Sequence, residues 1–179
     1  MAPAQASLLA KLDTQERVRD FLTNAVASGR ASHAYLFLGA PGAGKLDAAW
    51  ALAQAFLCEQ DGCGSCDSCV RVARHTHPDV HYYTPESATG YLIAQTRELL
   101  DDVPLAPIRA KAKVYIIDRA EQLRANTANA LLKTLEEPPE HVLFILATTE
   151  LHKVPATILS RCQRFDFRRI GAEDISRRL

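Results

Sequence analysis

The sequence predicts an α/β domain in which helices flank a parallel β-sheet. Short apolar runs alternate with segments of helical periodicity along most of the chain, which is the order that parallel strands require. These runs are continuously apolar, as expected for strands that are buried on both faces. A glycine-rich turn joins the first run to the next helical segment, and turns of this kind hold phosphate groups in many α/β folds.

The first element is predicted to be an amphipathic helix. Asp13 and Glu16 have the spacing of a capping box, with Asp in place of the usual Ser or Thr. Gly29 is expected to end the helix, because glycine readily adopts the left-handed conformation found there. Between these ends, apolar residues recur at helical spacing and line one face. They are Val18, Phe21, Leu22, Ala25 and Val26.

The remaining elements alternate in type. Strands are expected at residues 35–38, 80–83, 114–117, 142–147 and 164–167. Helices are expected at residues 46–56, 93–102 and 128–135. The last of these helices has to end at Pro138 and Pro139, because a proline inside a helix removes a hydrogen bond and clashes with the preceding turn.

Length and composition exclude several classes of protein. The 179 residues suit one domain and part of a second, at roughly 150 residues per domain. Twenty-one basic residues balance 21 acidic ones, which excludes a uniformly basic nucleic-acid-coating surface but permits a local basic patch. The longest uncharged stretch, 31–44, is shorter than the roughly 18 apolar residues that cross a bilayer. No signal peptide is visible in the first ten residues, so we expect a cytoplasmic protein that does not bind membranes.

A phosphate-binding loop is predicted at residues 39–46, Gly-Ala-Pro-Gly-Ala-Gly-Lys-Leu. Its glycines would let backbone N–H groups converge on phosphate oxygens, and its lysine would reach the terminal phosphates. The candidate binding residues are Gly39, Gly42, Gly44 and Lys45. Leu46 stands where a hydroxyl residue normally holds Mg²⁺, and Asp47 is turned about 100° away along the helix. We therefore expect weak or vestigial ATP binding; the alternative is an ordinary Gly/Pro turn.

Asp118 is the candidate for the second half of this site, since it follows the apolar strand 114–117. In many P-loop machines the next residue is a glutamate that orients the attacking water. Here it is Arg119, which stays protonated and cannot act as a base. Glu121 is expected to point elsewhere, and the alternative for Asp118 is that it merely caps a strand. We expect no ATPase activity from this chain by itself.

Four of the five cysteines lie within twelve residues and predict a metal site. They are Cys58, Cys63, Cys66 and Cys69. Zn²⁺ favours four sulfur ligands in structural sites, and a closed shell of this kind leaves no position for catalysis. Redox chemistry is the main alternative. Three histidines that follow could replace one cysteine or could be ordinary surface or core residues: His75, His77 and His81. Cys162 is expected to be a small buried apolar residue.

Several segments together resemble the bacterial clamp loader of DNA polymerase III over about residues 8–170. Besides the loop and the cysteines, they are Ser32–Phe37, Asn129–Pro139, Leu146–Thr149 and Ile158–Cys162. The motor subunits of that machine, gamma and tau, have Lys-Thr in the loop and an Asp-Glu pair on the second strand. The pairs Lys45-Leu46 and Asp118-Arg119 instead resemble the delta-prime subunit.

The resemblance implies an AAA+ P-loop domain over residues 1–168, with a five-stranded parallel sheet and a small zinc-binding insertion at about 58–78. It also implies that residues 169–179 begin a helical lid. Arg161 would be an arginine finger that reaches the ATP of a neighbouring subunit. Thr148 matches the position that senses the terminal phosphate, although it would hydrogen-bond only backbone if the loop no longer holds nucleotide.

The function that the resemblance implies is support of sliding-clamp loading onto primed DNA, within a DNA-directed DNA polymerase holoenzyme. The implied partners are the gamma/tau and delta subunits and, through the complex, the clamp and the primer-template DNA. An ATP-hydrolysing motor subunit is the alternative, and a free zinc-binding regulatory protein is a third hypothesis. A group of C-terminal arginines would contact DNA phosphates or form an exposed or intersubunit face. It comprises Arg164, Arg168, Arg169, Arg177 and Arg178.

Overall fold

The computed structural model describes residues 7–176. Its centre is a sheet of five parallel strands in the order β2-β3-β4-β1-β5, which confirms the predicted fold class. The strands are β1 (Ala34–Leu38), β2 (Val80–Tyr83), β3 (Lys113–Ile117), β4 (Val142–Thr148) and β5 (Gln163–Asp166). β4 is the central strand, with β3 and β1 on either side of it, and these three inner strands are almost wholly buried on both faces.

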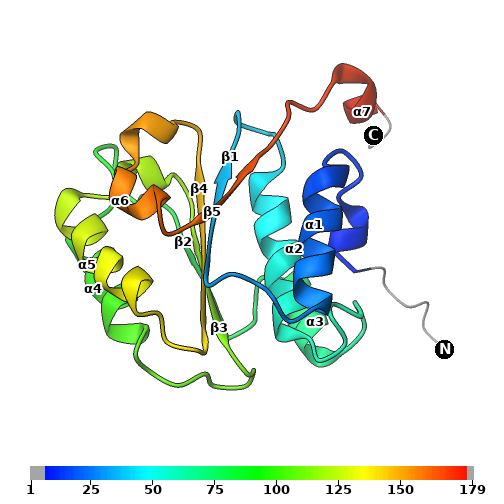
Figure 1. Cartoon of the computed structure of the whole chain (residues 1–179), viewed down its shortest axis with the longest axis horizontal. Helices are drawn as coiled ribbons and strands as arrows, with labels where there is room; N and C mark the ends of the chain where they lie inside the picture. Colours follow the sequence, from blue (N-terminus) through cyan, green and yellow to red (C-terminus); the bar gives the residue numbers. More distant parts are fainter. Residues whose placement is uncertain (1–6, 177–179) are drawn as a thin grey trace.

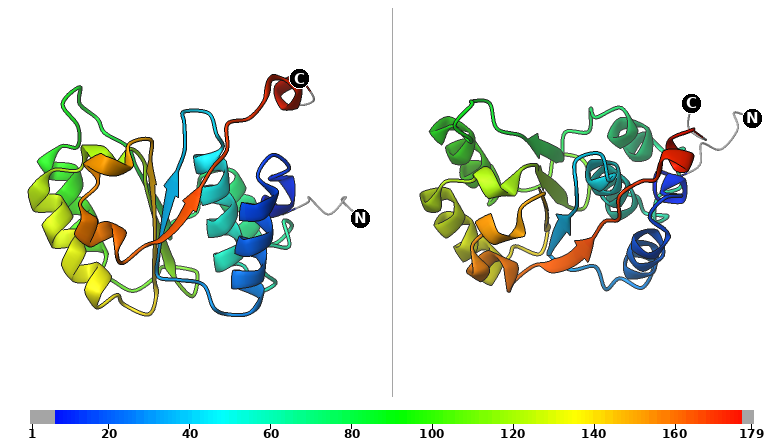
Figure 2. Two further views of the ribbon diagram at one scale, coloured as in Figure 1. Left: turned by 45° about the horizontal axis from the view of Figure 1, so that its top comes forward. Right: turned by 90° about the horizontal axis from the view of Figure 1, so that it is seen from above.

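Helices cover both faces of the sheet, with α1, α2 and α3 on one side and α4, α5 and α6 on the other (Figures 1 and 2). The bounds are α1 (Glu16–Ala27), α2 (Lys45–Leu57), α3 (Asp67–Ala73), α4 (Ile93–Asp102), α5 (Ala125–Glu136), α6 (Ala156–Leu159) and α7 (Ala172–Ser176). Short 3₁₀ turns are η1 (Leu9–Lys11), η2 (Ala120–Gln122) and η3 (Leu151–Lys153). Among the described residues, none of these helices has the length and apolar character needed to cross a bilayer.

Two apolar cores lie on the two faces of the sheet, and alternate residues of each strand pack into one core or the other. In β1, Tyr35 and Phe37 pack into the core under α1 and α2, whereas Leu36 packs into the core under α4 and α5. Successive side chains of a strand point to opposite faces, so one apolar run serves both cores. This double burial explains why the strands lack the polar alternation of a half-exposed sheet.

The register brings the loops at the carboxyl ends of three strands together. Leu38 of β1 pairs with Thr148 of β4, and Ile117 of β3 pairs with Leu146 of the same strand. The backbone N–H of Gly39 also donates to the carbonyl oxygen of Thr148 at 3.2 Å. The segments that follow β1, β3 and β4 therefore meet at one edge of the sheet, where ligands bind in open α/β folds.

The start of α1 differs from the sequence prediction. The helix begins at Glu16 with Gln15 as its N-cap, and no side chain caps it, so the predicted capping box at Asp13 is wrong. The Gln15 amide instead donates to the carbonyl oxygens of Ala43 at 3.1 Å and Arg168 at 2.6 Å. These two hydrogen bonds connect the start of α1 to the glycine-rich loop and to the chain after β5. The tertiary contacts of Gln15 therefore take the place of the local cap predicted at Asp13.

Other ends and faces were predicted with mixed success. Gly29 ends α1 with φ +67°, as expected. Phe21 is 45% exposed and packs edge-on against Phe165 at a ring distance of 5.0 Å, so the predicted apolar face is only partly buried. The helix α3 was not predicted. Within residues 169–179, the structure has the short helix α7; Arg177 and Arg178 lie outside the described residues.

Candidate functional site

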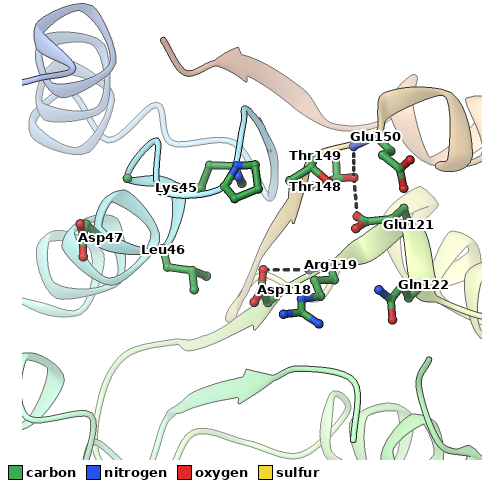
Figure 3. Close-up of a pocket in the computed structure, with 13 residues that line it drawn as sticks. Lys45, Leu46, Asp47, Asp118, Arg119, Glu121, Gln122, Thr148, Thr149 and Glu150 are labelled. Atoms are coloured by element: carbon green, nitrogen blue, oxygen red, sulfur yellow. Dashed lines mark hydrogen bonds between the residues drawn. The ribbon is translucent and has the colours of Figure 1, made fainter. Parts of the chain in front are cut away.

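A pocket of about 540 Å³ lies at the carboxyl ends of β1, β3 and β4 (Figure 3). It is built from the glycine-rich loop and the start of α2 on one side and from the segments after β3 and β4 on the other. The lining residues are Pro41, Gly42, Gly44, Lys45, Leu46, Asp47, Asp118, Arg119, Glu121, Gln122, Thr148, Thr149 and Glu150. The structure thus brings most of the predicted phosphate-site residues together; Gly39, just before them, adjoins Thr148 through its backbone.

The loop has the conformation that its glycines make possible. Gly42 and Gly44 have φ of +77° and +90°, a region that L side chains rarely adopt. Gly44 is also the N-cap of α2, so the first free N–H groups of that helix point toward the pocket end. Backbone geometry suited to an anion is therefore present, whatever the side chains around it contribute.

Lys45 is folded back on its own loop. Its ammonium donates to the carbonyl oxygens of Gly39 at 2.6 Å and Ala40 at 2.9 Å, and the residue is only 8% exposed. Burial lowers the pKa of Lys45, while the carboxylates of Asp118 and Glu121 oppose part of that shift. A phosphate would have to replace these carbonyl contacts in order to bind the ammonium.

The metal position of the loop is apolar. Leu46 lines the pocket and offers no ligand atom. Asp47, one residue further along α2, points away from Asp118 and Thr148 in Figure 3, as its helical position predicts. No residue at the start of α2 therefore stands in for the hydroxyl that holds Mg²⁺ in P-loop ATPases.

The opposite wall carries Asp118 and an arginine. Asp118 accepts hydrogen bonds from the backbone N–H of Arg119 at 2.9 Å and from the hydroxyl of Tyr82 at 3.3 Å. Arg119 adopts a left-handed conformation with φ +48°, which costs a non-glycine residue about 1 kcal/mol or more. Its guanidinium is exposed and lies beside Asp118 in Figure 3.

The prediction that Glu121 points elsewhere is wrong. The left-handed turn at Arg119 leads into η2, which carries Glu121 back to the pocket. There the hydroxyl of Thr148 donates to Glu121 Oε2 at 2.5 Å and accepts from the backbone N–H of Glu150 at 3.1 Å. Thr148 thus contacts a carboxylate as well as backbone. The sequence holds no signal for this, because arginine is a poor predictor of positive φ.

The charges around the pocket oppose anion binding. Its lining includes two cationic side chains, Lys45 and Arg119, and four carboxylates. The carboxylates are Asp47, Asp118, Glu121 and Glu150. A magnesium ion would reverse this balance in an active ATPase, but Leu46 cannot hold one. The electrostatics therefore agree with the expected weak binding of ATP.

A second candidate site is formed by four cysteines that run from the C-cap of α2 into the first turn of α3. Their Sγ atoms all lie within 4.8 Å of one another. The pair Cys58 and Cys66 is separated by 3.8 Å, and the pair Cys63 and Cys69 by 3.9 Å. A tetrahedral site with metal–sulfur bonds of about 2.3 Å has sulfur–sulfur edges of about 3.8 Å. The cluster could therefore hold one metal ion with four thiolate ligands.

Backbone N–H groups surround these sulfurs. Cys58 Sγ accepts from the N–H of Gln60 at 3.3 Å and of Cys63 at 3.4 Å, and Cys63 Sγ accepts from the N–H of Cys66 at 3.4 Å. The N–H groups of Ser65 and Cys66 lower the pKa of Cys63 to about 6, which favours a thiolate at neutral pH. The tight turns that allow these bonds depend on residues with positive φ, namely Asp61, Gly62 and Gly64.

The nearby histidines do not join this cluster. His75 stacks on Trp50 at a ring distance of 3.8 Å. His77 is buried and accepts from the backbone N–H of Asp79 at 3.1 Å, and His81 stacks on Tyr115 at 5.0 Å. None of the three histidines replaces a cysteine, so they match the other alternative, that they are ordinary surface or core residues.

Cys162 and Arg161 lie together on the far side of the sheet from the cysteine cluster. Cys162 was expected to be buried, but it is only partly buried and packs against the apolar core under α4 and α5; this burial raises the pKa of its thiol to about 11. Arg161 follows α6 and hydrogen-bonds to Glu136, the last residue of α5, at 2.7 Å. It is not part of the lining of the pocket that contains Lys45.

These features match a known family. The sequence profile described as "DNA polymerase III, delta subunit" matches residues 14–171. The chain belongs to this family of clamp-loader subunits. Its relatives include DNA polymerase III subunit tau of Bacillus subtilis, 46% identical over 169 residues, and subunit delta' of the same organism, 39% identical over 170 residues. The tau protein of Escherichia coli is 44% identical over 169 residues.

The matches cover the chain far better than they cover the relatives. They include 92% of this chain but 30% of the B. subtilis tau protein, and 93% of this chain but 51% of the delta' protein. This clamp-loader chain thus spans about half the length of the delta' relative and less than a third of the length of the two tau relatives. Both subunit types are similar to it, so overall identity does not distinguish a tau-like from a delta-prime-like role.

Solved structures support the fold. A gamma subunit-related protein of Thermotoga maritima superposes with a TM-score of 0.59 at 22% identity, covering 86% of this chain and 46% of that one. The RuvB Holliday junction branch migration motor of T. maritima gives a TM-score of 0.62 at 17% identity, with 97% and 51% coverage. At these identities the likeness concerns the P-loop AAA+ fold alone.

Proposed function

We propose that this clamp-loader subunit is of the non-motor, delta-prime type and supplies Arg161 to the ATP of a neighbouring motor subunit. In the cytoplasm it would act with gamma/tau and delta subunits to load the sliding clamp onto primer-template DNA, as part of the DNA polymerase III holoenzyme. The observation that carries the proposal is the pocket itself, which keeps the shape of a phosphate site while Leu46 and Arg119 occupy its metal and base positions.

The place of Arg161 supports an action in trans. The side chain emerges from the turn after α6 and is held by groups of α5 and α6, outside the lining of the chain's own pocket. Its side chain is 32% exposed, so its guanidinium is accessible to a second molecule. A guanidinium that reaches a transferring phosphoryl group stabilises its charge and accelerates hydrolysis by about 10³- to 10⁵-fold.

The test is ATP turnover in a clamp loader reconstituted from this chain at full length and its partner subunits. Arg161→Ala is expected to lower DNA-stimulated ATP hydrolysis at the adjacent site by about 10³-fold, and clamp loading with it. Arg97→Ala is the matched control, because Arg97 is an exposed residue of α4 whose side chain makes no hydrogen bond or ion pair among residues 7–176. Unchanged turnover with Arg161→Ala would contradict the proposal.

One observation favours the alternative that the subunit is itself a motor. Glu121 lies in the pocket and hydrogen-bonds to Thr148, so a carboxylate is present on the wall where a water-orienting base would act. The alternative is tested in a complex whose other ATPase sites are inactivated. ATP turnover that persists there, and that Glu121→Gln abolishes, would establish the motor role; turnover at background supports the non-motor role.

The four-cysteine cluster is proposed to hold a structural zinc ion. Its four sulfurs lie within 4.8 Å of one another, and the two Sγ–Sγ distances of 3.8 and 3.9 Å fit the edge length of a tetrahedral zinc–thiolate site. Protein purified under reducing conditions is expected to contain about one zinc per chain. Zero zinc by elemental analysis in such a preparation would refute the assignment.

A further inference from the structure

The guanidinium of Arg161 is anchored within its own subunit. Its Nη1 donates to the carbonyl oxygen of Thr157 at 2.7 Å and to the hydroxyl of Ser160 at 3.2 Å. Its Nη2 donates to Glu136 Oε1 at 2.7 Å. Two of these acceptors belong to the segment of Arg161 itself, whereas Glu136 is 25 residues away and links the arginine to α5.

The helix ends explain why these groups meet. Glu136 is the last residue of α5, where the negative end of the helix disfavours a carboxylate, and Glu137 adds a second charge beside it. The carbonyl oxygen of Thr157 lies in the last turn of α6 and needs a hydrogen-bond donor from outside the helix. One guanidinium satisfies both needs, since it is a cation and a multiple donor.

The anchored arginine keeps donors for a second partner. A guanidinium has five N–H groups, and the three hydrogen bonds use both groups of Nη1 and one of Nη2. Among residues 7–176, the N–H of Nε and the remaining N–H of Nη2 have no hydrogen-bond partner. These groups are available to phosphate oxygens while the other contacts persist.

We propose that Glu136 is the positioning residue of Arg161 in the trans reaction; this rests on the function proposed above. A free arginine loses rotamer freedom when it meets a phosphate, which reduces the benefit of the contact. Glu136 fixes the guanidinium before the neighbour's ATP arrives. Its effect is therefore expected in the catalytic step of the adjacent subunit rather than in the stability of this one.

The experiment compares variants in the reconstituted clamp loader. Glu136→Ala is expected to lower kcat for DNA-stimulated ATP hydrolysis about tenfold, equivalent to about 1.4 kcal/mol, with an unchanged KM for ATP. In the Arg161→Ala background it should have no further effect. Glu136→Gln should retain part of the rate, because its amide oxygen still accepts the hydrogen bond. Glu137→Ala is the matched control, an exposed neighbour whose side chain makes no hydrogen bond among the described residues.

The outcomes separate this inference from the function on which it rests. A full or increased rate with Glu136→Ala, while Arg161→Ala remains defective, would overturn the positioning role and leave the finger intact. No defect with Arg161→Ala would overturn both. An additive loss in the double variant would also overturn the positioning role, because it would show that Glu136 acts independently of Arg161. The Arg161–Glu136 pair is an ion pair at the surface, and such pairs add little stability, so assembly of the complex should be unchanged. If the alanine variant nevertheless assembles poorly, Glu136→Gln provides the same test.

Discussion

The loop before β3 depends on one buried carboxylate, and replacing it should destabilise the domain strongly. Asp79 is fully buried, and its side chain accepts three backbone N–H groups, from Ile108 at 2.6 Å, Arg109 at 2.7 Å and Ala110 at 2.8 Å. Asp79→Asn keeps the shape of the side chain but replaces one acceptor oxygen with a donor nitrogen. The change therefore isolates the hydrogen bonds from the packing.

The magnitude follows from how the three bonds divide between the two oxygens. Oδ2 accepts two of them, so the amide oxygen of asparagine retains those two in neutral form, at a loss of about 1 kcal/mol each. Oδ1 accepts the third, and the N–H of Ile108 would face an amide nitrogen and lose its partner, at about 1–3 kcal/mol. We expect a total of about 3–5 kcal/mol, or a fall in Tm on the order of 10 °C.

Urea denaturation monitored by circular dichroism measures this loss directly. The midpoint should shift while the m-value stays constant. Asp101→Asn is the matched control, since Asp101 is exposed and its side chain makes no hydrogen bond among the described residues. A loss below about 1 kcal/mol for Asp79→Asn would refute the reasoning.

Acid should erase the difference between Asp79→Asn and the wild type. Burial alone would raise the pKa of Asp79, but the three N–H donors outweigh it and hold the pKa below its usual 3.8. The stability that the ionised carboxylate provides is therefore complete above pH 3.8 and is lost as the pH falls through the lower folded-state pKa. A difference that persisted unchanged well below that range would contradict this sign.

Three further predictions concern the two sites. Removal of the proposed zinc ion by a chelator should shift the fluorescence of Trp50, the single tryptophan, to longer wavelength, because His75, six residues after Cys69, stacks on it; an unchanged spectrum after metal loss would contradict this coupling. Gly62→Ala should cost about 1–2 kcal/mol and weaken metal retention, since φ is +95° and the new Cβ would lie 3.3 Å from Ala55; thermal unfolding measures it. Leu46→Thr should raise the affinity for Mg-ATP at least about tenfold, because a hydroxyl would restore the missing metal ligand; equal calorimetric affinities for the variant and the wild type would count against our account of the pocket.

The sequence predicted the fold because its strongest signals are local. The apolar runs that became β1, β3 and β4 are buried on both faces, and such runs are readable without knowledge of their neighbours. The phosphate loop was equally readable, because Gly42 and Gly44 take the positive φ values for which glycine is specific.

The parts that escaped prediction depend on tertiary contacts or on unusual backbone. Glu121 reaches the pocket because Arg119 adopts a left-handed conformation, which cannot be predicted from an arginine in the sequence. The predicted cap at Asp13 gave way to Gln15, whose amide bonds to residues far along the chain. The short helix α3 begins at the cysteine cluster, because its N-cap is the candidate ligand Cys66. Its position therefore depends on the cluster, and its sequence has no helical periodicity from which it could be predicted.

The central claim is that the pocket keeps the form of a triphosphate site without the groups that bind and hydrolyse Mg-ATP. The most direct measurement is a calorimetric titration of the purified chain with Mg-ATP. Our account predicts no binding in the micromolar range, because Leu46 offers no metal ligand and the carboxylates around Lys45 outnumber the cations. A micromolar dissociation constant would contradict it.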